Sequence, residues 1–310
     1  MTAASTAEYD AFGPWILPVS SYDQVPPVFR SHPIDFTRAH DVLKVPREVA
    51  HRDATPRSHL YDSLLVLDGE GLEVLTRAGH RYTVERISRD SIAAVDSGAE
   101  LLAGWLSVLA TDGRRIDVAF NGGSLPVITD LADRLLGWSA TDLEPAARDV
   151  LDLTALGFHD VGLVNGYNSV PDPQHRRRVV AAYAERTPMS RRSSLHRLLD
   201  GRSRLSGAVF GSDERYAVVT TRSGWVRSTR KPDLSLRRIV IPKHQVTSVA
   251  VAQHAFLDDV AELTIRCQAT RLVLAVPGDE AESVADAIDP ARAHHRLGRA
   301  DRGTRPASDR

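Results

Sequence analysis

One short pattern of apolar residues occurs twice in this chain. The stretch ISRDSIAAV covers 87–95 and IPKHQVTSV covers 241–249, so both follow I-x-[RK]-x-x-[IV]-x-x-V at a spacing of 154 residues. In each copy a strand pattern ends at the first apolar residue, a polar turn follows, and a second strand pattern begins. A strand-turn-strand frame that recurs at one spacing predicts two copies of one small β-rich domain.

Alternation of apolar and polar residues continues around the first copy. A hairpin is predicted over 104–120, with Asp112-Gly113 at its turn, because glycine accepts the positive φ of a tight turn. The apolar residues of 124–138 then fall on one helical face, and Ser124 stands at the N-cap position. The strands predicted before this hairpin lie at 60–68, 71–77, 80–87 and 91–97.

The second copy has the same order of predicted elements. A hairpin over 260–277 is followed by a closing helix at 280–288, and the strands before it lie at 207–211, 215–221, 224–231, 234–241 and 244–253. A chain of 310 residues has room for two domains of ordinary size. The predicted fold class is α+β, with domains at 60–138 and 206–289.

Three segments flank these two domains. Residues 139–205 are predicted as a helical basic connector, with helices at 142–157 and 168–187, and residues 290–310 lack apolar periodicity and are predicted to be disordered. Residues 1–59 contain seven prolines, which disfavour regular structure, so an extended Pro-rich strap is predicted there. The strap carries apolar side chains that we expect to be buried on the first domain: Phe12, Trp15, Ile16, Val28, Phe29 and Phe36.

These patterns resemble the pleckstrin-homology-like (PH-like) fold, in which antiparallel strands are closed by one C-terminal helix. The repeated frame is similar to a strand-turn-strand of bacterial PH-like domains. The stretch KVPREVAHRDATPRSHLYDSLLVL (44–67) resembles the segment that leads into such a domain in uncharacterised bacterial proteins. The resemblance implies two β-barrel or sandwich domains with a binding or scaffolding role, and it implies no catalytic residue. By this resemblance, anionic lipid headgroups would contact basic residues near the first hairpins of the second domain, namely Arg222, Arg227, Arg230 and Lys231.

The basic residues of this chain are almost all arginine. Of 39 Lys and Arg residues only Lys44, Lys231 and Lys243 are lysine, so 39 − 3 = 36 are arginine. Codon bias toward arginine accounts for this as well as selection for phosphate contacts does. The net charge of −1 and the scarcity of aromatic residues among the basic ones disfavour nucleic acid as a partner. A local basic patch for a protein partner is predicted at Arg176, Arg177, Arg178, Arg191 and Arg192.

No motif for catalysis or cofactor binding occurs in the sequence. Dinucleotide-binding, P-loop, zinc-protease, nucleophile-elbow and EF-hand patterns are all absent, so no catalytic, cofactor-binding or metal-binding residue is predicted. The single cysteine, Cys267, ends a strand pattern and is expected to be a buried thiol. The stretch 121–124, Asn-Gly-Gly-Ser, suits a helix cap, with an anion site at the helix N-terminus as the alternative.

The sequence therefore favours a non-enzymatic interaction or scaffold protein. A protein partner would bind through the PH-like domains, by strand addition at a sheet edge or in the groove beside a closing helix. One alternative is peripheral binding to an anionic membrane surface through the basic residues of the second domain. Another is an enzyme with its site between the repeats. The cytoplasm is the expected location, because no secretory signal and no spanning apolar stretch is present in the sequence.

Overall fold

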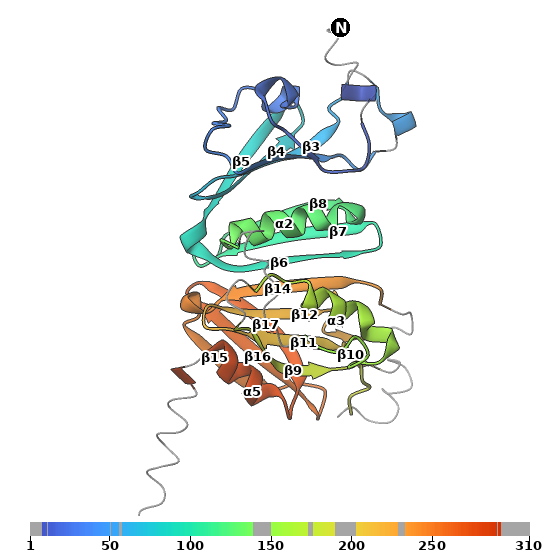
Figure 1. Ribbon diagram of the computed structural model, residues 1–310, viewed down its shortest axis with the longest axis vertical. Coiled ribbons are helices and arrows are strands. Elements are labelled where there is room, and N and C mark those ends of the chain that lie inside the picture. Colours follow the sequence, from blue (N-terminus) through green and yellow to red (C-terminus); the bar gives the residue numbers. More distant parts are fainter. Residues whose placement is uncertain are drawn as a thin grey trace, which may run out of the picture. The chain divides into compact units, whose positions relative to one another are not determined.

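The chain divides into two compact units, which are described separately. The structure is a computed structural model, and it describes residues 8–10, 12–49, 51–55, 58–138, 150–172, 176–189, 203–228, 233–289 and 291–292. Unit 1 comprises residues 1–110 and 114–144, and unit 2 comprises 111–113 and 145–310. Strands make up most of the regular structure in both units (Figure 1).

Unit 1 contains two groups of antiparallel strands and one closing helix. The first group has the order β1-β2-β3-β4-β5. The second has the order β8-β7-β6, and helix α2 packs against β6. The bounds are β1 Leu17–Pro18, β2 Asp41–Pro46, β3 Tyr61–Leu67, β4 Gly71–Ala78, β5 Arg81–Ser88, β6 Ile92–Glu100, β7 Ala103–Ala110, β8 Arg115–Asn121 and α2 Leu125–Leu135. Each strand and the helix predicted from the sequence of this unit is present.

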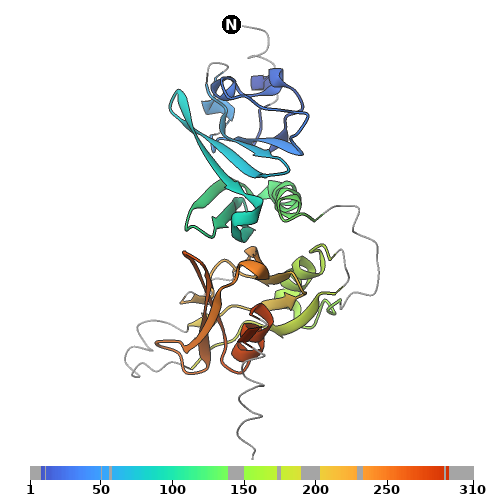
Figure 2. The same cartoon turned by 90° about the vertical axis from the view of Figure 1, so that its left-hand side faces the viewer.

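Unit 2 contains the corresponding two groups of strands. The first has the order β14-β12-β11-β9, and the second is a three-stranded sheet β15-β16-β17 against which helix α5 packs (Figure 2). Helix α3 packs on β11, β12 and β14, and β10 pairs with β13. The bounds are α3 Val161–Asn168, β9 Arg178–Tyr183, β10 Arg204–Leu205, β11 Ala208–Ser212, β12 Tyr216–Thr221, β13 Val226–Arg227, β14 Leu236–Pro242, β15 Ser248–Gln253, β16 Val260–Cys267, β17 Thr270–Pro277 and α5 Ala281–Ile288.

The repeated frame has the same local structure in both units. In unit 1 a single 3₁₀ turn, η4 (Arg89–Ser91), joins β5 to β6. In unit 2 an identical turn, η8 (Lys243–Gln245), follows β14 at the same spacing of 154 residues and precedes β15. The apolar residue after each turn closes it by donating its backbone N–H, from Ile92 to Arg89 O and from Val246 to Lys243 O. The frame thus fixes where the first strand group of each unit ends and the second begins.

The basic residue of the frame supports the closing helix in both units. Arg89 Nη2 donates to Arg134 O in the last turn of α2, at 3.2 Å. Lys243 Nζ donates to Ser212 Oγ at 3.1 Å, and that hydroxyl donates to Ala287 O in the last turn of α5, at 3.0 Å. Carbonyls in the last turn of a helix have no partner within the helix and carry negative partial charge. Arg89 satisfies such a carbonyl directly, whereas Lys243 reaches α5 only through the Ser212 hydroxyl and makes its shorter contact, 2.8 Å, with Asp213 O.

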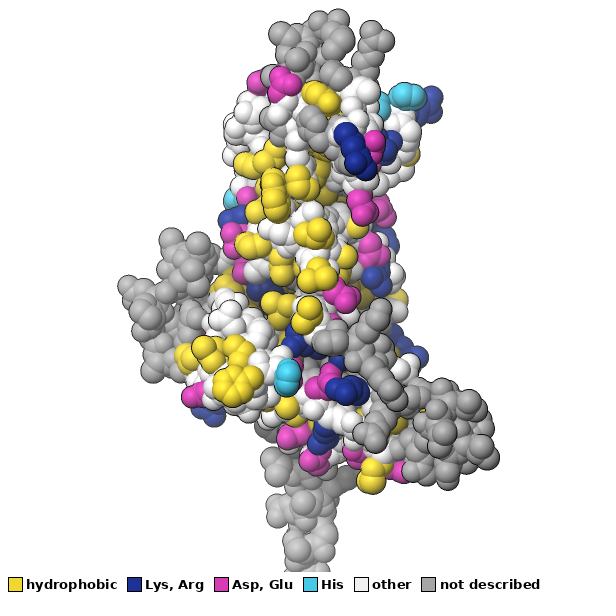
Figure 3. Space-filling view, turned by 90° about the vertical axis from the view of Figure 1, so that its right-hand side faces the viewer, with side chains coloured by type: hydrophobic (Ala, Val, Ile, Leu, Met, Phe, Trp, Pro, Cys, Tyr) yellow, Lys and Arg dark blue, Asp and Glu magenta, His cyan; other side chains and the backbone are white. Residues whose placement is uncertain are grey.

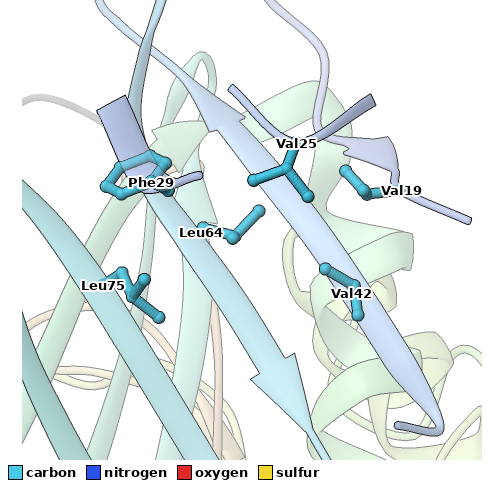
Figure 4. Close-up of a cluster of buried hydrophobic side chains, with 6 residues drawn as sticks. All are labelled: Val19, Val25, Phe29, Val42, Leu64 and Leu75. Atoms are coloured by element: carbon cyan, nitrogen blue, oxygen red, sulfur yellow. The ribbon is translucent and has the colours of Figure 1, made fainter. Parts of the chain in front are cut away.

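The N-terminal strap is part of the core of unit 1. Figure 4 shows Val19, Val25 and Phe29 meeting side chains of β2, β3 and β4, and the cluster is made up of Val19, Val25, Phe29, Val42, Leu64 and Leu75. Phe12 and Ile16 are buried as expected, and Val28 and Phe36 are partly buried against this cluster. The expectation of burial was wrong for Trp15, which is 52% exposed. The strap also supplies β2, which ends at Pro46. This strand was not predicted, because the seven prolines of the segment disfavour regular structure.

The segment between the two predicted domains is not a helical connector in its described part. The helix predicted over 168–187 is wrong, because Arg178–Tyr183 forms strand β9 and pairs with β11. Asp172, which resembles a helix cap in the sequence, instead accepts the backbone N–H groups of Arg176 (3.3 Å) and Arg177 (3.0 Å). The helix in this region is α3, eight residues that lie before Asp172. Residues 150–172 and 176–189 therefore belong to the fold of unit 2.

Candidate functional site

Strand β15 presents a row of outward-facing backbone groups at the edge of its sheet. It pairs with β16, and β16 lies between β15 and β17. The N–H of His254 donates to Val260 O, which fixes the residues that exchange hydrogen bonds with β16 as 248, 250 and 252. The amide and carbonyl groups of Val249, Val251 and Gln253 consequently point away from β16, and we call these groups the β15 edge. Such an edge is a template for a further strand.

Arg292 occupies one carbonyl of the β15 edge. Its Nη1 donates to Val249 O at 2.9 Å, and its Nη2 pairs with Glu282 on α5 at 2.7 Å. Its Nε lies 3.6 Å from Asp286 on the same helix. The guanidinium therefore links the edge strand to the closing helix and places a donor where an added strand would place one.

Arg292 lies in the segment 290–310 that was predicted to be disordered. A basic residue just beyond a helix C-terminus is a common partner of that helix, which is the only sequence signal that pointed to it. The outward-facing carbonyl that it contacts follows from the strand register and could not be predicted from the sequence.

Two of the predicted lipid-contacting arginines are engaged within unit 2, Arg222 as a buried residue and Arg227 as a half-buried one. Arg222 donates to Asp160 Oδ1 at 3.0 Å, to Ser235 O at 2.8 Å and to His159 O at 2.9 Å. Arg227 pairs with Glu185, and its Nε lies 3.4 Å from Asp233. The side chains of Arg222 and Arg227 are only 11% and 12% exposed. They hold the segment before α3 and the β9 region onto the sheet, and neither is an exposed cation for a headgroup. Arg230 and Lys231 lie outside the described residues.

The predicted basic partner patch is divided between different environments. Arg177 is 4% exposed and donates to Val170 O and Pro171 O, and burial holds its pKa below the usual value. Arg176 is exposed and pairs with Glu214 at 2.8 Å. Arg178 is exposed at the start of β9. Arg191 and Arg192 lie outside the described residues. Of the three described members, two therefore remain on the surface.

The stretch 121–124 leads into α2 and is contacted by the strap. Asn121 Oδ1 accepts the N–H of Gly123 at 3.0 Å, and Ser124 Oγ accepts the N–H of Ile16 at 3.0 Å. A Cβ on Gly123 would lie 2.3 Å from the ring of Trp15, so the ring in its present position packs on this glycine. Ser124 stands at the N-cap position of α2 as predicted, but its hydroxyl makes no capping hydrogen bond to the helix. The Asn121 contact caps the 3₁₀ turn η5 (Gly122–Ser124) that precedes α2. The strap lies where an anion would have to approach.

Cys267 is fully buried at the end of β16, and burial raises the pKa of its thiol to about 11. The expectation of a buried thiol is confirmed. In the part of the chain that the structure describes, no group of three or more His, Cys, Asp or Glu side chains is arranged to hold a metal ion. Within the same residues, no helix has the length and apolar character needed to span a membrane.

No protein-family model matches the chain, and a search of curated proteins found no significant match.

Proposed function

We propose that this chain is a non-enzymatic interaction or scaffold protein built from two PH-like domains. The identification as PH-like is supported by the order of elements, which is the same in both units. Each unit has an antiparallel run of four strands, β2 to β5 or β9 with β11, β12 and β14, then three more strands and a closing helix. We place the protein in the cytoplasm as part of the same proposal.

The β15 edge carries the proposal of a protein partner. An extended segment of the partner would add to β15 and form hydrogen bonds with the outward-facing groups of Val249, Val251 and Gln253. The side chains of Ala250 and Ala252 on the exposed face are small, so they offer little steric hindrance to a neighbouring strand. Affinity would come from the main chain, and specificity would come from side chains that contact α5.

The membrane alternative loses two of the four residues that were expected to carry it. Arg222 is engaged in a buried ion pair and Arg227 in a half-buried one, so neither side chain is free to contact a lipid headgroup. A protein partner is therefore the function that the described residues support best.

Strand addition is tested by removing one N–H from the β15 edge. Peptides that bind the full chain are selected from a displayed random library. Their affinities are then measured for the wild type, for Val251→Pro and for Val251→Ala. The N–H of Val251 points away from β16, so proline at this position leaves the sheet ladder intact. We expect Val251→Pro to weaken the selected peptides about tenfold and Val251→Ala to leave their affinity nearly unchanged. Equal binding by both variants, or selected peptides that map to another surface by amide chemical shifts, would exclude the β15 edge.

Replacing Arg292 by alanine is expected to strengthen the same peptides by about three- to tenfold. The substitution frees the carbonyl of Val249, which the guanidinium otherwise occupies, and one hydrogen bond is worth roughly 0.5–1.5 kcal/mol. The control is Arg271→Ala, which removes an exposed arginine from β17 in the same sheet. If Arg292→Ala and Arg271→Ala have the same effect, Arg292 does not compete with the partner strand.

A further inference from the structure

The turn between β6 and β7 exposes two adjacent leucines. Leu101 is 71% exposed and Leu102 is 69% exposed, so both hydrophobic side chains face solvent at the tip of a hairpin. Leu101 also has φ of 54°, a left-handed conformation that is costly for a residue with a branched apolar side chain. Asparagine or glycine at position 101 would avoid both the exposure of an apolar side chain and the unfavourable backbone conformation. A turn that is unfavourable in backbone conformation and in solvation points to a role in binding.

Trp15 of the strap lies beside this turn. Its ring covers Gly123, while the neighbouring Gly122 donates its N–H to Leu102 O at 2.8 Å. A Cβ on Gly122 would lie 2.1 Å from Leu101 O, so the backbone of the turn is in close contact with this glycine. Leu101, Leu102 and Trp15 together form what we call the apolar tip, and hydrophobic side chains gather on the side of unit 1 where this turn lies (Figure 3). Backbone contacts hold the tip in place before any partner arrives.

The three segments that form and support the apolar tip contain few charged residues. Residues 12–19 and 121–126 carry no charged side chain, and Glu100 is the one charged residue in 99–103. These three side chains alone are far fewer than the roughly 20 residues a side that a stable protein interface uses. A bilayer needs no complementary cavity, and it accepts Trp and Leu side chains at the boundary between headgroups and acyl chains.

We propose that the apolar tip inserts into the interfacial region of a lipid bilayer without recognising lipid charge. The binding is driven by burial of Leu101, Leu102 and Trp15 and is correspondingly insensitive to salt. This goes beyond the proposed partner binding at the β15 edge, and it uses none of the basic residues that a charge-dependent membrane contact would need.

The equivalent turn of unit 2 provides a natural comparison. It is longer and exposes Phe256, which stands 154 residues after Leu102 and is 51% exposed. Asp258 and Asp259 stand two and three residues after Phe256, and carboxylates oppose entry into a bilayer. The proposal is therefore confined to the turn of unit 1, and Phe256 serves as the matched control.

The test is sedimentation of the full chain with vesicles of phosphatidylcholine alone and of phosphatidylcholine with phosphatidylglycerol, each at low and high salt. We expect the wild type to bind both kinds of vesicle at both salt concentrations. The double variant Leu101→Asn with Leu102→Ser should lower the partition coefficient about tenfold or more. Asparagine accepts the left-handed conformation, so the variant is expected to fold, and circular dichroism checks this. Phe256→Ser should bind like the wild type.

A second readout uses the tryptophan of the tip. Vesicles should shift the fluorescence emission of the wild type to shorter wavelength, and Trp15→Phe should remove that shift because the ring of Trp15 enters the bilayer. Three results would overturn the proposal. They are no binding of the wild type to either vesicle, binding to the charged vesicles alone that is lost in salt, and equal loss of binding in Phe256→Ser and the double variant.

Discussion

Replacing Arg222 by alanine is expected to lower the free energy of unfolding of unit 2 by about 3–5 kcal/mol. Arg222 and Asp160 form an ion pair in which the side chains are 11% and 6% exposed. The substitution would leave the carboxylate of Asp160 buried without its counter-charge. It would also leave two backbone carbonyls, those of Ser235 and His159, without this donor. Lysine would restore the charge but not the three separate contacts, because an ammonium group has no planar fork of donors.

Urea denaturation together with hydrogen exchange of β11 and β12 measures this loss of stability within unit 2. The matched control is Arg176→Ala, which breaks an ion pair whose side chains are 59% and 71% exposed and should cost less than about 1 kcal/mol. A stable Arg222→Ala protein that has lost only affinity for acidic vesicles would restore the original lipid-binding hypothesis for this residue.

Replacing Phe29 by alanine is expected to lower the free energy of unfolding of unit 1 by about 3–5 kcal/mol. The ring is fully buried among residues of the strap and of β2, β3 and β4, and it meets the ring of Tyr82 edge-on at 5.8 Å between centroids. The variant loses the transfer free energy of the ring and leaves a cavity that the surrounding strands cannot fully close. The strap around residue 29 should become more sensitive to proteases, because Phe29 is its main anchor.

The stability change is measured by urea denaturation, and the cleavage sites are identified by limited proteolysis with mass spectrometry. Phe158→Ala is the matched control, since it deletes the same ring from a position that is 86% exposed and should change stability by less than about 0.5 kcal/mol. A similarly small effect for Phe29→Ala would mean that the strap does not pack on unit 1 in solution.

The strands and closing helices were predictable because their signals are local. Alternation along Arg81–Ser88 and Thr270–Pro277 and the one-sided apolar pattern of α2 depend only on residues that are close in the sequence. The turn of the repeated frame is also local, since its closing hydrogen bonds join residues three apart. These features were therefore recognisable without knowing any long-range contact.

The added strands β2 and β9 were not predictable in the same way. β2 and β9 are six residues each, and each pairs on one side with a strand of the following domain, β3 or β11. For β9 the pattern Asp172-Pro173 followed by Arg-rich and Ala-rich residues satisfied the rules for a helix start as well as those for a strand. Tertiary pairing with β11 decided between the two, which is how context overrides weak local preference.

The sequence by itself determined the late hairpin and closing helix of each unit, the position of the frame and the burial of Cys267. It did not determine the whole strand order, because the strand predicted at 224–231 is described only as β13, Val226–Arg227, which pairs with β10. Only the tertiary structure decided what the arginines do. Arg222 and Arg227 are adjacent in sequence to residues that look solvated, yet their carboxylate partners Asp160 and Glu185 lie 62 and 42 residues away along the chain. The tertiary structure also decided the β15 edge and the apolar tip. Whether a backbone group faces outward, or a leucine is exposed, depends on which segments the fold places beside it. The sequence specifies which residues are charged or apolar, but whether each side chain is exposed to solvent depends on contacts between distant segments.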